Sequence, residues 1–90
     1  MVTVTEYAAK ELKERLNDKT SSPDIGLRLL PMVGGLCILG LDTERPGDYV
    51  LTYEGSKVLL IGVEYYGVFQ GLVVDCEETG KGPILFVRQE

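Results

Sequence analysis

The stretch IGLRLLP, residues 25–31, is where the hydrophobic pattern of the chain changes from a period near 3.6 to a period of two. Leu27 and Leu29 alternate with Arg28, as expected for a β-strand that packs one face on a core. Pro31 has no amide hydrogen, which favours a sheet edge or a bend at that point. We therefore expect a helix before this stretch and strands after it.

The residues before it predict one N-terminal helix. Thr3 followed by Glu6 matches a capping box, and Thr5 is the better cap if Val4 belongs to a strand. Charged side chains at positions 10, 11 and 13–15 are expected on the outer face, and the helix is expected to end near residue 17 or 18. Its apolar stripe has four members at helical spacing: Ala8, Ala9, Leu12 and Leu16.

The residues after it predict short strands. The apolar run at 36–41 follows a turn signal at Gly34-Gly35 and is typical of a strand covered on both faces. Segments 49–53 and 57–61 flank Glu54-Gly55-Ser56 and predict a hairpin. Further expected elements are a short helical turn at 64–70, strands at 72–77 and 84–87, and a glycine turn between those strands at 79–82.

Composition limits the possible functions. With 90 residues we expect one domain over 1–90. The net charge of -5 disfavours nucleic acid as a partner, because an acidic surface repels phosphates. We find no signal peptide or basic membrane patch, and the uncharged stretch 29–41 is too short and too interrupted by proline and glycine to span a bilayer. We expect a cytoplasmic protein with free thiols.

The chain contains no histidine. This removes the commonest general base near neutral pH, and with it serine–histidine and cysteine–histidine nucleophile systems. Gly80-Lys81-Gly82 lacks the spacing of a phosphate-binding loop, and no calcium-loop spacing is present. We therefore do not expect an enzyme.

Two cysteines are the candidate metal ligands. Cys37 lies in an apolar run after glycines, and Cys76 lies between acidic residues, which raise a thiol pKa and oppose reactivity. For both, burial as a small apolar side chain is the simpler interpretation. Carboxylates at positions 75, 77 and 78 are best interpreted as a solvated strand end. Tyr65, Tyr66 and Phe69 could line a pocket, but with the residue at 68 they are more simply interpreted as a helical turn that closes the core.

The order of segments resembles that of the HesB/IscA-like family, the A-type iron–sulfur cluster carriers. The resemblance covers nearly the whole chain and implies a mainly β fold with one N-terminal α-helix, a β-sandwich or partial barrel of short strands. In chain order the matching segments are Val2-Thr3-Val4-Thr5, Ala8-Ala9, Gly26-Leu27-Arg28-Leu29, Gly34-Gly35-Leu36-Cys37, Gly47-Asp48, Gly55, Phe69-Gln70-Gly71-Leu72, Asp75-Cys76 and the segment 80–86.

The sequence departs from the family at its cluster ligands. The resemblance implies three cysteines, one in Gly-Gly-Cys-Ser-Gly and two in a C-terminal Cys-Gly-Cys. The sequence ends at Glu90 without the second motif, so we expect those two ligands to be missing. Without a gap the first ligand position falls on Leu36, and Cys37 matches only after a one-residue insertion. We therefore expect a divergent member with a degenerate site.

Three functions follow as hypotheses. The first is a role in iron–sulfur cluster metabolism through contacts with protein partners such as iron–sulfur assembly components, without the three-cysteine site and without a cofactor. The second is a homodimer that binds a metal or an iron–sulfur cluster through Cys37 and Cys76, which together would offer four thiolates. The third is a non-metal protein-binding or structural module.

Overall fold

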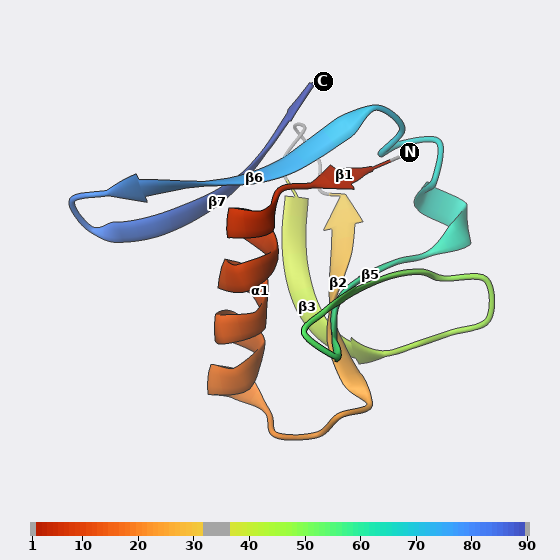
Figure 1. Ribbon diagram of the computed structural model, residues 1–90. Coiled ribbons are helices and arrows are strands. Elements are labelled where there is room, and N and C mark those ends of the chain that lie inside the picture. Colours follow the sequence, from red (N-terminus) through yellow and green to blue (C-terminus); the bar gives the residue numbers. More distant parts are fainter. Residues whose placement is uncertain (1, 32–36, 90) are drawn as a thin grey trace.

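The helix of this chain lies against two β-sheets in the computed structural model, which describes residues 2–31 and 37–89 (Figure 1). The predicted turn at Gly34-Gly35 and the position of Leu36 lie outside the described residues. The elements are β1 (Thr3–Val4), α1 (Glu6–Lys19), β2 (Ile25–Pro31), β3 (Cys37–Thr43), β4 (Tyr49–Tyr53), β5 (Ser56–Ile61), the 3₁₀ helix η1 (Val63–Tyr65), β6 (Leu72–Thr79) and β7 (Gly82–Gln89). The predicted fold class, mainly β with one N-terminal helix, is confirmed.

Helix α1 begins where the sequence predicts. Thr5 is the N-cap, and its hydroxyl accepts a hydrogen bond from the backbone N–H of Ala8 at 3.2 Å. The predicted stripe is buried, with Leu12 fully enclosed. Glu11, expected on the outer face, is instead buried and receives a hydrogen bond from Arg15 at 2.7 Å. That expectation was wrong because Arg15 also donates to the carbonyl of Pro83 in β7, which lies over this side of the helix.

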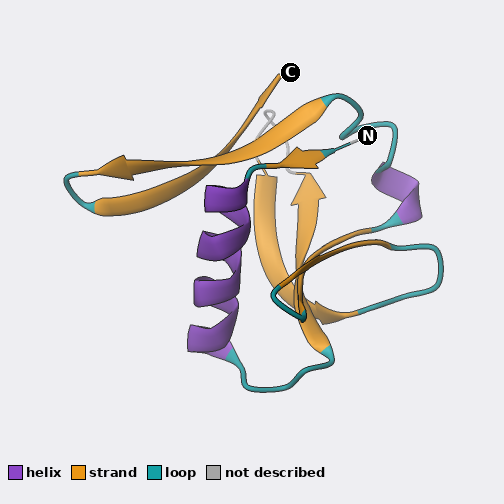
Figure 2. Cartoon of the chain, viewed as in Figure 1, coloured by secondary structure: helices purple, strands orange, loops and turns teal. Residues whose placement is uncertain are grey.

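The strands form one sheet in the order β1-β6-β7 and a second in the order β3-β2-β5-β4. Both are mixed, because β1 pairs with β6 in parallel and β2 pairs with β5 in parallel, while the other pairs are antiparallel. The β6–β7 hairpin crosses one end of α1, and the larger sheet runs alongside the helix (Figure 2). The sheets and the helix thereby enclose the core.

The predicted hairpin is confirmed as β4–β5, except that Ser56, expected in the turn, is the first residue of β5. Glu54 and Gly55 form its two-residue turn, and both have positive φ angles, 48° and 80°. This is the geometry whose twist matches that of the flanking strands. The hairpin places β5 at an inner position of the larger sheet, where residues 58–61 are almost fully buried.

Strand β3 differs from the prediction. An uninterrupted apolar run suggested a strand covered on both faces, yet β3 is the outermost strand of its sheet, and Ile38 and Leu41 are 43% and 47% exposed. The strand that is covered on both faces is β5. Apolar composition alone does not distinguish an inner strand from an outer one, because strand order depends on pairings between distant segments.

The expectation that segment 64–70 closes the core is confirmed for Phe69 but not for Val68. Its ring is 1% exposed and packs edge-to-face with Tyr65, with ring centroids 6.4 Å apart. Val68, which was expected to join them in closing the core, is 58% exposed. The short η1 and the turn after it therefore direct one aromatic ring inward and leave the intervening aliphatic side chain in solvent.

The side chains of the central buried cluster are those of Ala8, Leu12, Leu16, Leu27, Leu29, Val58, Leu59, Ile61, Phe69, Val74 and Cys76.

Candidate functional site

Cys76, one of the two predicted ligand candidates, lies in β6 opposite Leu85 of β7. Its side chain belongs to the buried core cluster and is 7% exposed. Burial raises the pKa of the Cys76 thiol, and the nearby Glu11 carboxylate raises it further. Metals and clusters bind the thiolate, so a buried thiol with a raised pKa is a poor ligand. The surroundings of Cys76 are those of a core side chain.

Cys37, the other candidate, is the first residue of β3 and pairs with Pro31 at the end of β2. It thus belongs to the larger sheet, whereas Cys76 belongs to the smaller one. The two cysteines come from different sheets, and the backbone pairings do not bring them side by side.

Two of the three carboxylates of β6, those of Asp75 and Glu78, make hydrogen bonds within the chain, and Glu77 is exposed. Asp75 accepts hydrogen bonds from the backbone N–H of Cys76 at 2.8 Å, the hydroxyl of Thr5 at 2.9 Å and Nε of Arg88 at 3.2 Å. These donors lower the pKa of Asp75, with the Cys76 N–H the largest cause. The hydroxyl of Tyr7 donates to Glu78 at 2.7 Å, and this bond raises the pKa of Tyr7 to about 12. These contacts fasten the start of α1 to β6.

The donor set can be tested for its fit to a cluster. Among residues 2–31 and 37–89, no group of three or more cysteine, aspartate or glutamate side chains is arranged to hold a metal ion. An iron–sulfur cluster is held by four ligands, usually thiolates. The described residues of one chain therefore do not fit a resident cluster.

A buried charged network around Arg28 was missed by sequence reasoning. The Arg28 side chain is 4% exposed, and its guanidinium donates two hydrogen bonds to Asp48, at 2.6 and 3.0 Å, and one to Asp42 at 2.6 Å. It donates a further bond to the carbonyl of Thr43 at 3.0 Å, and the backbone N–H of Arg45 donates to Asp48 at 2.7 Å. The network fixes the connection between β3 and β4.

The network also sets the ionisation of its members. Hydrogen bonding to Arg28 lowers the pKa of both Asp42 and Asp48, and Asp48 in turn raises the pKa of Arg28. All three groups therefore remain charged at neutral pH. The sequence did contain a signal for this arrangement. Arg28 is a single charged residue in an apolar strand, and two aspartates, Asp42 and Asp48, follow it along the chain.

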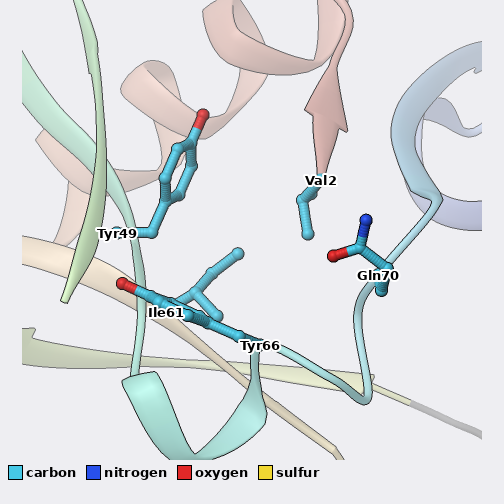
Figure 3. A pocket seen from close by; sticks show the side chains of 5 residues that line it. All are labelled: Val2, Tyr49, Ile61, Tyr66 and Gln70. Carbon is cyan, nitrogen blue, oxygen red and sulfur yellow. The ribbon is translucent and has the colours of Figure 1, made fainter. Parts of the chain in front are cut away.

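The structure also contains an apolar pocket of about 450 Å³ (Figure 3). Tyr66, for which the sequence favoured a place in the core over a pocket, lines it, whereas the buried Phe69 belongs to the core. Its other described lining residues, which the sequence did not indicate, are Val2, Tyr49, Ile61 and Gln70.

Several solved structures resemble this one, among them the following three. Escherichia coli SufA, which is involved in biosynthesis of iron–sulfur clusters, matches with a TM-score of 0.76 and 23% identity over 98% of this chain and 84% of SufA. IscA with a 2Fe–2S cluster matches with a TM-score of 0.59 and 25% identity over 99% of this chain and 82% of IscA. An Aquifex aeolicus protein solved by NMR matches with a TM-score of 0.69 and 24% identity over 99% and 91% of the two chains.

In sequence, the chain matches no family model and no curated protein. The structural matches nevertheless extend over 98–99% of its length. This chain therefore has the fold of the A-type iron–sulfur carriers, the HesB/IscA fold. Among the described helices, none is both long and apolar enough to cross a membrane.

Proposed function

We propose that this chain, built on the A-type carrier fold, acts in iron–sulfur cluster metabolism through contacts with other proteins, without a three-cysteine cluster site of its own and without enzymatic activity. The observation that carries the proposal is the fold likeness to SufA and IscA along almost the whole chain. SufA is involved in the biosynthesis of iron–sulfur clusters, and the IscA structure contains a 2Fe–2S cluster.

The positions of the two cysteines support the part of the proposal that this chain has no three-cysteine cluster site of its own. Cys76 is buried in the core with a raised thiol pKa, so it would have to leave the core before it could bind iron. Cys37 stands at the start of an outer strand. If a cluster is handled as cargo, we expect Cys37 to contribute a thiolate and the other ligands to come from a partner protein.

Anaerobic reconstitution with ferrous iron and sulfide tests this proposal. We expect no stoichiometric iron or acid-labile sulfide on the monomer, and any visible absorption should disappear in Cys37→Ala and persist in Cys76→Ala. Circular dichroism of both variants controls for loss of fold. A monomer that carries a full cluster dependent on both cysteines would contradict the proposal and favour the two-cysteine site.

A binding measurement separates this function from a non-metal structural module. Purified cysteine desulfurase and a purified cluster scaffold protein would be titrated into the chain by calorimetry. The proposal expects saturable binding to at least one of them. Absence of binding to both, combined with a colourless reconstitution, would reject a role in iron–sulfur metabolism.

A further inference from the structure

The apolar pocket is built from segments that are far apart in the sequence. Val2 and Gln70 reach into it from one side, Tyr49 and Ile61 from the other, and the ring of Tyr66 crosses between the two sides (Figure 3). These residues come from the N-terminal segment, β4, β5 and the connection between β5 and β6. The volume of about 450 Å³ lies within the range of sites that enclose small molecules.

The walls of the pocket are held in place by polar contacts outside it. The hydroxyl of Tyr66 donates a hydrogen bond to the carbonyl of Gly47. The next residue, Asp48, accepts two hydrogen bonds from the buried Arg28, and Tyr49 follows directly. Ile61 is 1% exposed and belongs to the core cluster. A ligand would therefore meet walls that are already positioned, which reduces the ordering that binding requires.

The chemistry of the described lining residues defines the class of ligand. Two tyrosine rings, a valine and an isoleucine offer flat and aliphatic surfaces, and none of the five side chains is ionisable near neutral pH. A charged group brought here would lose its hydration without gaining an opposite charge. The Gln70 carboxamide, directed toward the pocket in Figure 3, offers both a donor and an acceptor.

We propose that this pocket binds an uncharged small molecule with a flat aromatic ring and a carboxamide or similar donor–acceptor group, the ring lying among Tyr49, Tyr66 and Val2 and the polar group pairing with Gln70. Binding at this pocket would be a function separate from the handling of iron–sulfur clusters. Tyr49 and Ile61 lie in β4 and β5, at the opposite side of the sheet from β3, which begins at Cys37.

The test is a titration of the purified full chain with three neutral ring amides: benzamide, 2-naphthamide and indole-3-carboxamide. Amide proton and nitrogen shifts would be followed by two-dimensional NMR in protein without iron, so the result does not depend on the proposed function. We expect saturable shifts for at least one amide, largest at Val2, Tyr66 and Gln70. Benzoate and 2-naphthoate should bind more weakly than the matching amides, because the carboxylate would be desolvated.

Variants at exposed positions keep the experiment interpretable. Gln70 is exposed, so Gln70→Ala should fold, and it should weaken binding by about two- to tenfold through loss of one hydrogen bond. Asn17→Ala, which removes the same functional group from the exposed side of α1, should bind as the wild type does. Absence of saturable shifts with all three amides, or equal affinity for the carboxylates, would overturn the proposal.

Discussion

Arg28 shows how one side chain can be both the most polar and one of the most buried in its strand. Its neighbours Leu27 and Leu29 face the helix, so strand alternation turns Arg28 to the opposite face. There it is neutralised by two carboxylates, those of Asp42 near the end of β3 and Asp48 in the β3–β4 connection. Every buried polar side-chain atom among the described residues has a hydrogen-bond partner. The guanidinium is therefore fully compensated as long as both aspartates remain.

Removal of one partner should reveal how much the fold depends on this compensation. We expect Asp48→Ala to lower the free energy of unfolding by about 3–5 kcal/mol, because Arg28 would remain buried with half of its pairing gone. Urea denaturation followed by circular dichroism measures the change. Asp24→Ala, at an exposed aspartate outside the network, is the matched control and should stay within about 0.5 kcal/mol of wild type. Equal losses in the two variants would contradict this role.

At the scale of elements, one glycine in β2 and one in β3 differ in how tightly their surroundings are packed. A methyl group on Gly26 would lie 2.9 Å from the carbonyl oxygen of Lys57 in β5. The backbone of β5 cannot easily move away from such a methyl group. The absence of a side chain at Gly26 therefore allows the parallel strands β2 and β5 to lie close together. A methyl group on Gly40 of β3 would have no neighbour within 4 Å.

This contrast gives a paired prediction. Gly26→Ala should destabilise the protein by about 1–3 kcal/mol, the range for an overpacked site, because β2 and β5 would have to separate. Gly40→Ala should be neutral or slightly stabilising, since alanine restricts the unfolded chain without a clash. Thermal unfolding of the two variants compares them directly. A larger loss in Gly40→Ala than in Gly26→Ala would show that the described strand order is wrong.

Local elements could be predicted because their signals lie within a few residues of each other. The cap at Thr5, the buried Leu12 and the turn at Glu54-Gly55 are all decided by neighbours in the sequence. The outer position of β3 could not be predicted this way, because it results from the parallel pairing of β2 with β5. For the same reason the pocket was only partly predicted: Tyr66 was a candidate, but Gln70 and Val2 meet it only in the folded chain.

At the scale of the whole molecule, paired aspartates join separate parts of the fold. Asp42 links β3 to β2, Asp48 links the β3–β4 connection to β2, and Asp75 links β6 to α1 and β7. The native pKa of each is lowered relative to its ordinary value. In acid the unfolded chain therefore takes up protons before the native protein does, and protonation favours unfolding.

We accordingly expect the free energy of unfolding to be nearly constant from pH 7 to about pH 5 and to fall as the pH drops below about 4, the ordinary range of aspartate. The direction of the change follows from the lowered native pKa values. Each ionised aspartate stabilises the native state above the pKa that it has in the unfolded chain. This stabilisation is lost as the pH falls through the pKa that the aspartate has in the folded protein. Asp42→Asn should show a shallower acid limb in urea titrations at successive pH values, whereas Asp24→Asn should follow wild type. A stability that rises in acid would refute this account.

The pairing of β1 with β6 affects the order in which the protein folds during its synthesis. Thr3 and Val4 lie beside Val73 and Val74, and the nearby contact between Thr5 and Asp75 joins residues 70 positions apart. Closing so long a loop is entropically unfavourable and slows folding. On the ribosome, the first strand must wait without a pairing partner until β6 has emerged, while α1 and the larger sheet can already form. The smaller sheet is thus the last part of the described fold to assemble during synthesis.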